Sequence, residues 1–307
     1  LIELPNDPLY GPHEAISSIC SRWGELIFYS DNHRVWNGNH ALLANSDSLN
    51  LVEPDGTASF STIANATMIL PLPGDSMDRF FALLTMRDVG LLGGPPHVLQ
   101  YSLIDRYGDG TVGGTLLGSG NPERPLGNVE IQEKMTAIKH ANGRDWWIVC
   151  RSKTVDSDTL ISILLTDKGF LSPMYFLAPK SLGWGGNIKA SMDGSRISET
   201  ASNSNSKGVL YVYEFDRCSG EIEYLDSLPA PVNTGYYGLA FSNSSALLYA
   251  GTSYGMDLFQ IKLAPDSIEA VQQIVDFGNG RFFGHLQNGP NGKIYCNQQP
   301  FFDLTDP

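Results

Sequence analysis

Short apolar segments in which hydrophobic and polar residues alternate recur along the whole chain, and turn residues separate them. A period of two is typical of β-strands that bury one face. No long segment shows the 3.6-residue period of an amphipathic helix. Residues 266–275 come nearest to it, and they fit better as a strand in register with the others. The pattern predicts an all-β protein.

A hairpin is the first repeated unit: an apolar strand, a turn with Gly, Asn or Asp, and a second apolar strand. These turn residues tolerate the positive φ that a short hairpin needs. The predicted turns are Trp23-Gly24, Asn142-Gly143, Asp193-Gly194, Asn243-Ser244, Asn291-Gly292 and, in a more divergent copy, Pro73-Gly74-Asp75. The hairpins span residues 16–29, 66–84, 135–149, 188–198, 239–250 and 286–296.

A third and a fourth strand follow most of these hairpins. The third begins at Val98, Leu160, Val209 and Met256, and the fourth contains GTLLGS, SPMYFLA, IEYLDSL and AVQQIVDF. Four strands in roughly 50 residues form one blade of a β-propeller. Because a lone blade exposes an apolar face on each side, blades must stack to bury both faces. The predicted fold is therefore a β-propeller of four-stranded antiparallel blades, WD40- or YVTN-like, with six or seven blades in the complete domain.

The repeat fills residues 1–307 without a shift in composition, which predicts a single propeller domain. It gives five complete blades and the first hairpin of another. We therefore expect the domain to be incomplete at its C-terminal end, the parent protein to be longer, and residues 1–4 to help close the last blade.

The chain carries a net charge of −13. A field of that sign repels phosphate backbones and anionic lipid, so nucleic-acid binding is not expected. No apolar run approaches the roughly 18–20 residues that cross a bilayer, so membrane insertion is not expected either. GxSxG, HExxH and Walker motifs are absent. The sequence thus predicts no catalytic residue, no metal and no cofactor.

Side chains on the innermost strands of a propeller face its central channel, and aromatic residues at strand starts can line its mouth. The candidates for this channel and its rim are His140, Lys189, His285, Trp184 and Tyr236. They contain no acid–base pair that spacing identifies. Core packing is the alternative for the aromatic residues, and a role in its own hairpin turn is the alternative for His140.

The four cysteines show no CxxC spacing, which argues against a zinc site. Cys20 and Cys296 lie in strands of the first and last units, which ring closure would bring together. A disulfide between them and a pair of buried free thiols are both compatible with the sequence.

Several segments together resemble one protein family. They are HEAISSIC, GELIFYSDNHRVWNGNH, KMTAIKHANGRDWWIV, KASMDGSR, YVYEFDRCSGEIEY and NGPNGKIYCNQ. The chain resembles, over nearly its whole length, the N-terminal propeller of Bacteroidota surface proteins that also carry PKD-type domains and a gliding-motility-associated C-terminal sorting domain for type IX secretion. The resemblance implies export and a location at the cell surface.

In that setting, O-glycosylation at Asp-Ser or Asp-Thr followed by an aliphatic or similar residue is expected, and a glycan requires an exposed site. The candidate residues are Ser48, Ser76, Thr159, Ser227 and Ser267.

Three functions compete at this stage. The first is a non-catalytic module for protein or polysaccharide interaction, adhesion or scaffolding at the cell surface. The second is a lactonase-like hydrolase with a site in the central channel, which requires converging carboxylates and histidines. The third is a structural subunit of a surface filament that associates with itself through blade edges. The sequence favours the first and third, because no copy of the repeat carries a distinctive acid–base set.

Overall fold

The computed structural model describes residues 16–46, 49, 65–88, 97–108, 114–117, 122–153, 158–181, 185–202, 208–231, 234–252, 257–276 and 281–300. This part of the chain forms 22 strands and no helix, as the alternating pattern predicted. It accordingly holds no helix that is long and apolar enough to cross a membrane. The predicted strand at residues 1–4 lies outside the described residues.

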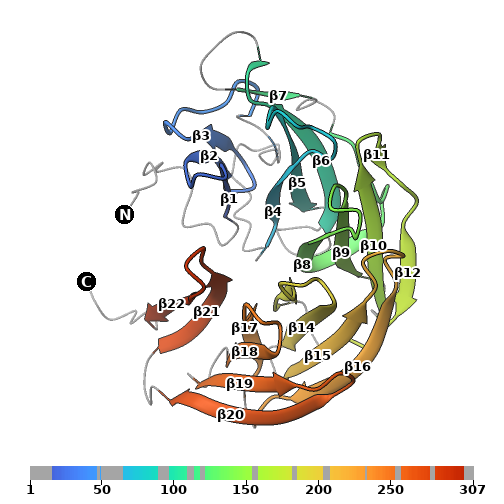
Figure 1. Ribbon diagram of the computed structural model, residues 1–307, viewed down its shortest axis with the longest axis vertical. Coiled ribbons are helices and arrows are strands. Elements are labelled where there is room, and N and C mark those ends of the chain that lie inside the picture. The colour runs from blue at the N-terminus through green and yellow to red at the C-terminus, as the bar shows by residue number, and fades with distance from the viewer. Residues whose placement is uncertain are drawn as a thin grey trace. The chain divides into compact units, whose positions relative to one another are not determined.

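The chain forms two compact units. The first contains residues 1–133 and 165–170, and the second contains residues 134–164 and 171–307. Two antiparallel sheets make up the described part of the first unit (Figure 1). One consists of β1 (Ser17–Cys20), β2 (Leu26–Ser30) and β3 (Val35–Asn37). The other contains β4 (Thr67–Pro71), β5 (Phe80–Asp88), β6 (His97–Asp105) and β7 (Thr115–Leu117), and β11 (Gly169–Phe170) also belongs to this unit.

The second unit repeats the four-stranded sheet. Its first sheet contains most of β8 (Glu130–Lys139) and β10 (Thr159–Thr166), with β9 (Trp146–Ser152) and β12 (Met174–Leu177). The next contains β13 (Ile188–Ala190), β14 (Arg196–Ser202), β15 (Gly208–Phe215) and β16 (Ile222–Pro229). The third contains β17 (Tyr236–Phe241), β18 (Leu247–Thr252), β19 (Asp257–Leu263) and β20 (Ile268–Asp276), and the hairpin of β21 (Arg281–Asn288) and β22 (Ile294–Pro300) follows. The predicted hairpins, third strands and fourth strands are confirmed.

The hairpin turns use the left-handed backbone conformation that their composition predicted. Gly143 has φ 72° and Gly194 has φ 73°, and glycine adopts such angles without a steric cost. The turn after β17 differs from the prediction. Its positive φ, 60°, belongs to Ser245 rather than to Asn243 or Ser244. Three polar residues in a row fit the turn equally well by composition, so the sequence could not choose the one that takes this conformation.

Apolar side chains from facing sheets fill the space between them, as stacked blades require. Trp147, Val149 and Leu160 of one sheet pack with Ile197 and Tyr213 of the next in one core cluster of the second unit. A second cluster joins β15 and β16 to the sheet of β17–β20, whose strands lie alongside them in Figure 1. In the first unit, a cluster that contains Phe28, Phe81 and Ile104 joins the two sheets.

Polar bridges between neighbouring sheets share a simple form, in which a side chain of one sheet donates a hydrogen bond to a backbone carbonyl of another. Asn187 Nδ2 donates to the Tyr237 carbonyl at 3.0 Å, and Asn288 Nδ2 donates to the Phe241 carbonyl at 2.8 Å. Asn32 Nδ2 does the same to Met86 in the first unit, at 3.0 Å. These contacts satisfy buried backbone acceptors that would otherwise have lost their hydration.

Candidate functional site

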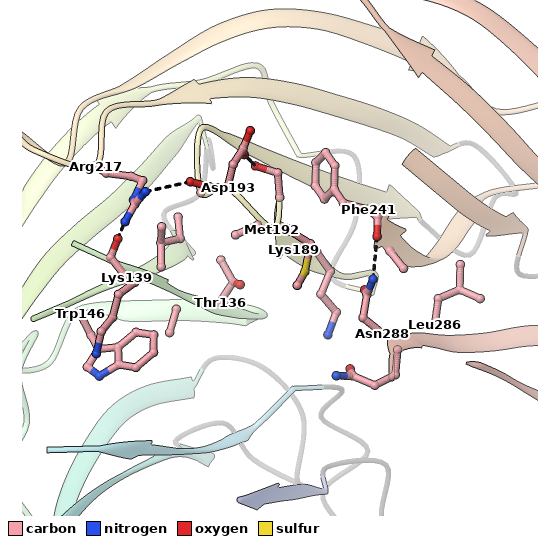
Figure 2. Close-up of a pocket in the computed structure, with 17 residues that line it drawn as sticks. Thr136, Lys139, Trp146, Lys189, Met192, Asp193, Arg217, Phe241, Leu286 and Asn288 are labelled. Carbon is pink, nitrogen blue, oxygen red and sulfur yellow. Dashed lines mark hydrogen bonds between the residues drawn. The ribbon is translucent and has the colours of Figure 1, made fainter. Parts of the chain in front are cut away.

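A pocket of about 490 Å³ lies in the second unit. Its walls come from β8, β13, β17 and β21, which are the innermost strands of successive sheets, from the start of β9, and from the turns after β13 and β15. Ligand pockets in proteins are commonly of this size, roughly 300–1,000 Å³. Figure 2 shows its lining side chains, with Trp146 at one end and Asn288 and Leu286 at the other.

Two of the three cations in this pocket are held in place by neutral groups. Lys139 Nζ lies 3.8 Å from the centre of the Trp146 ring and donates to the Arg144 carbonyl at 3.1 Å. Burial lowers the Lys139 pKa, and the negative charge of nearby Asp145 partly offsets this lowering. Arg217 donates through Nε to the Lys139 carbonyl at 2.9 Å and through Nη1 to the Asp193 carbonyl at 3.1 Å. Arg217 thereby connects the turn regions of two sheets.

Lys189 is the third cation, and its side chain extends into the pocket between Thr136 and Asn288 (Figure 2). Loss of hydration lowers the pKa of this amine because burial penalises its charged form. His285 on β21 interacts electrostatically with Lys189. Burial first, and the Lys189 charge second, lower the His285 pKa to about 4. His285 Nε2 is buried and has no hydrogen-bond partner in the described structure.

Asp193 is the one carboxylate among the residues that line the described pocket. It accepts hydrogen bonds from Ser191 Oγ at 2.6 Å, the Ser195 amide at 3.0 Å and Ser195 Oγ at 2.9 Å. Burial alone would raise the Asp193 pKa, but these donors outweigh it and the pKa is lowered. The carboxylate is therefore ionised and committed to its own turn.

The pocket offers uncharged polar groups, one half-buried aromatic ring and three cationic side chains. Thr136 and Asn288 supply uncharged polar groups, and Trp146 and Met192 supply apolar surface. The described residues contain no group of three or more His, Cys, Asp or Glu side chains placed to hold a metal ion. This lining suits the recognition of a polar ligand with hydrogen-bond acceptors.

The residues proposed from the sequence for a channel and its rim lie in different environments. Lys189 lines the pocket and His285 lies next to Lys189. His140 lies in its hairpin turn, where Nδ1 accepts from the Asn142 amide at 2.9 Å and the ring stacks on Trp147. Tyr236 is 1% exposed and packs in the core. Its ring packs edge-to-face on Phe259 of β19, with the ring centres 5.9 Å apart, so core packing, the alternative given for the aromatic residues, applies to it. Trp184 lies outside the described residues.

Exposure varies among the candidate glycosylation sites. Ser76 is exposed, Thr159, Ser227 and Ser267 are partly buried, and Ser48 lies outside the described residues. Modification of each stays a prediction.

Cys20 and Cys296 belong to different units. A disulfide between them also stays a prediction.

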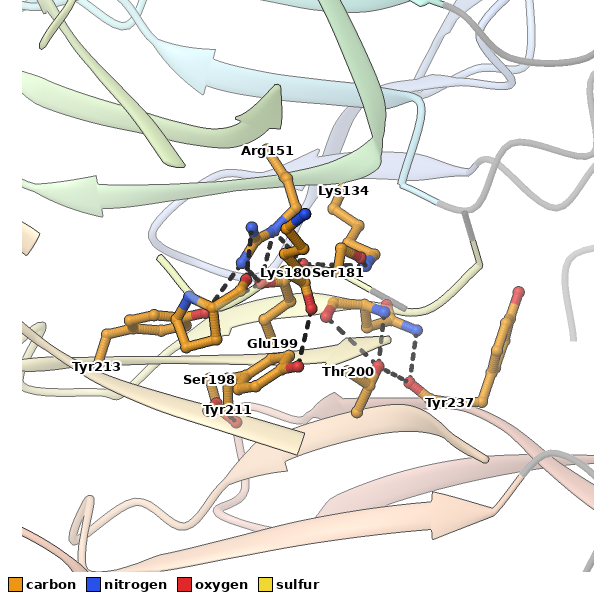
Figure 3. Close-up of polar contacts among 12 residues, drawn as sticks. Lys134, Arg151, Lys180, Ser181, Ser198, Glu199, Thr200, Tyr211, Tyr213 and Tyr237 are labelled. Carbon is orange, nitrogen blue, oxygen red and sulfur yellow. Dashed lines mark hydrogen bonds and ion pairs between the residues drawn. The ribbon is translucent and has the colours of Figure 1, made fainter. Parts of the chain in front are cut away.

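A buried ionic cluster in the second unit was not predicted from the sequence (Figure 3). Glu199 accepts from Arg151 Nε at 2.7 Å, from Arg151 Nη2 and from Lys134 Nζ at 2.9 Å. All three side chains are fully buried. Tyr213 OH accepts from Arg151 Nη2 at 2.9 Å, and Ser181 Oγ lies 3.3 Å from Lys134 Nζ.

The cluster joins two sheets, because Lys134 and Arg151 lie on β8 and β9 whereas Glu199 lies on β14. Burial alone would raise the Glu199 pKa, but the charges of Arg151 and Lys134 outweigh it and hold the pKa below its ordinary value. The signal in the sequence was a charged residue inside each of two otherwise buried strands, WWIVCRS and RISETAS.

Comparison with known proteins identifies the fold. No family profile matches the sequence, and no curated protein sequence matches it. The structure is similar to that of a glucose dehydrogenase, with 13% identity, a TM-score of 0.53 and coverage of 93% of both chains. It is also similar to the periplasmic gluconolactonase of Pseudomonas aeruginosa, with 13% identity, a TM-score of 0.50 and coverage of 87% of this chain and 72% of the other. These structures are propellers, and the chain has the β-propeller fold of four-stranded antiparallel blades.

Proposed function

We propose that this chain is a non-catalytic binding module of a secreted or cell-surface protein, and that its pocket takes part of a glycan. The pocket itself is the observation that carries this proposal. Four inner strands and the start of β9 present uncharged polar groups, amines and Trp146 to one cavity, whereas its one carboxylate, Asp193, is held in a turn. The surface location, with type IX export, is supported by the sequence resemblance.

Carbohydrate is the first ligand class to test. Sugars combine an apolar ring face with many hydroxyl groups, which match the aromatic ring of Trp146 together with Thr136 and Asn288. The two propellers of similar structure carry names that refer to glucose and to gluconolactone. A protein partner with an exposed polar loop is the other form of the same proposal.

A glycan array with the labelled 307-residue chain tests this function. We expect binding to a limited set of glycans and at least a tenfold loss of affinity in Trp146→Ala, because stacking on an aromatic ring is removed. Tyr175→Ala is the matched control, since Tyr175 is 54% exposed on β12 and does not line the pocket. Absence of glycan binding, or equal loss in both variants, would contradict the proposal.

A lactonase-like hydrolase is the competing enzyme. It predicts turnover of gluconolactone above the uncatalysed rate, and loss of that turnover in a variant of a pocket residue. Such a result would replace the binding function with a catalytic one. Under the binding proposal we expect no turnover, measured by titration of the released acid.

A filament subunit is the second candidate, and the sheet edges favour it. The edge strands β12, β16 and β20 carry large apolar side chains that are 40–83% exposed, namely Tyr175, Leu177, Tyr224, Val271 and Ile274. Unpaired strand edges with exposed apolar residues can join another chain by strand addition. Light scattering across a range of concentrations tests this: growth in mass that Leu177→Lys abolishes supports the filament, and a constant monomer mass excludes it.

A further inference from the structure

We propose that the glycan bound by the pocket is acidic, and that Lys189 binds a sugar carboxylate. This inference rests on the proposed function and names the ligand class of the same site. Its physical basis is a group of cations without anionic partners, in a protein whose net charge is −13.

None of the three cations of the pocket forms an ion pair with a carboxylate of the described residues. The hydrogen bonds of Lys139 and Arg217 go to backbone carbonyls, and Lys139 also lies over the Trp146 ring. Lys189 Nζ makes no hydrogen bond and no ion pair within the described structure. Asp193 makes no ion pair with them within the described residues, and its Oδ1 accepts from Ser191 and Ser195. The described pocket lining thus holds three cations against the single carboxylate of Asp193, and Lys189 is the cation without a hydrogen-bond partner in this part of the chain.

A cation that has lost water and gained no counterion destabilises the folded protein. Lys189 is half-buried, and a bound anion reduces this cost because the ammonium then gains a charge-assisted hydrogen bond. The lowered pKa of Lys189 has the same cause, loss of hydration without a compensating negative charge. His285 is neutral above about pH 4, so Lys189 is the positive charge of this pair that can bind the anion.

The donors favour a carboxylate over a phosphate or a sulfate. One unengaged ammonium group reaches the pocket, and the Arg217 guanidinium is occupied by two carbonyl groups. Sites for more highly charged anions use several cations or a bidentate arginine. Thr136 and Asn288 flank Lys189 and offer neutral contacts to the hydroxyl groups of the same sugar. A uronic acid unit in an oligosaccharide has this combination of groups.

Calorimetric titration with matched oligosaccharides tests the inference. The probes are a galacturonic acid trimer and the galactose trimer of the same linkage, which differ only in the carboxylate. We expect the acidic trimer to bind roughly 10- to 100-fold more tightly, as a hydrogen bond to a charged group contributes. Added salt should weaken that preference because it screens the ionic contact.

Substitutions locate the effect. Lys189→Met keeps the length of the side chain and removes its charge, so it should reduce the affinity for the acidic trimer to that for the neutral one. Lys189→Arg should retain part of the preference. Lys262→Met is the matched control, because Lys262 is exposed on β19 and pairs with Glu269 outside the pocket. Lys189→Met should melt at the same or a higher temperature than the parent protein, which shows that lost binding is not unfolding.

The outcomes separate this inference from the proposed function. Equal affinity for the two trimers, or a preference that survives Lys189→Met, overturns the inference and leaves glycan binding intact. Tighter binding of a sulfated galactose trimer than of the galacturonic acid trimer also overturns it. Failure of every neutral and acidic glycan to bind overturns both.

Discussion

Replacing Glu199 with glutamine tests whether the buried ionic cluster stabilises the contact between two sheets. The substitution keeps the shape of the side chain and removes the one carboxylate that both Arg151 and Lys134 contact. All three side chains are fully buried, so water cannot replace the lost charge. Breaking a buried ion pair by removing one partner costs about 3–5 kcal/mol.

The expected shift in melting temperature follows from the chain length. Unfolding entropy is about 2.1 cal/mol/K per residue, or about 0.6 kcal/mol/K if the 307 residues unfold together. A loss of 3–5 kcal/mol then lowers Tm by roughly 5–8 °C. Scanning calorimetry measures Tm, and denaturant titration followed by tryptophan fluorescence measures the free energy of unfolding.

Glu269→Gln is the control for burial. Glu269 accepts from Lys262 at 2.7 Å, but the two side chains are 49% and 55% exposed. An exposed pair contributes at most about 1 kcal/mol. Similar losses in the two variants, or a loss below about 1 kcal/mol in Glu199→Gln, would refute the reasoning from burial.

The pH dependence provides a second check on Glu199. Because its folded pKa lies below the ordinary value of 4.5, its contribution to stability is present above that pH and is lost as the pH falls through the folded pKa. The difference in stability between the parent protein and Glu199→Gln should therefore shrink below about pH 4.5. A difference that stays constant to pH 3 would contradict an ionised Glu199.

Three further predictions concern single groups. Cys150 is buried, and burial raises its pKa to about 12. A thiol reagent should therefore label exposed Cys20 and Cys218 in the folded protein and label Cys150 only after unfolding. Peptide mapping identifies the labelled residues. The pKa of His285 is about 4 in the folded protein and about 6.5 in the unfolded chain, so the unfolded chain binds this proton at higher pH. The free energy of unfolding should therefore fall as the pH falls from about 6.5 to 4. Denaturant titrations of His285→Phe should show a smaller fall over the same pH range. A Cβ at Gly238 would collide with the Gly284 backbone carbonyl on β21. Gly238→Ala should therefore destabilise the protein by about 1–3 kcal/mol. An unchanged denaturation midpoint would contradict the close approach of β17 and β21.

The strands were predictable from the sequence because their signal is local. Alternating apolar positions and turn residues lie within a few positions of one another, so the hairpin of β8 and β9 can be predicted from residues 135–149 alone. The turn before β18 shows what local sequence does not predict. Its composition predicted a turn, whereas the choice of Ser245 for the positive φ depends on how the flanking strands pair.

The site depended on distant pairings and was predictable only in part. Inner-strand position singled out Lys189, and the structure places it in the pocket. The roles of Arg217 and Trp146 there require knowing which hairpins become neighbours, which a repeat pattern does not give. The ionic cluster is harder still, because Glu199 meets Arg151 and Lys134 across 48 and 65 positions of sequence.

In the hydrogen bonds from Asn187 and Asn288 to backbone carbonyls, a mutation of the donor residue and a mutation of the acceptor residue have different effects. The acceptor is a main-chain group that every amino acid possesses, so Tyr237 and Phe241 can change identity without losing it. The donor exists only while the asparagine is kept. Each of these two bridges is thus encoded on one side alone, and a saturation library should tolerate replacement at half-buried Tyr237 better than at Asn187. Blades joined in this way can drift apart in sequence while keeping their mutual fit.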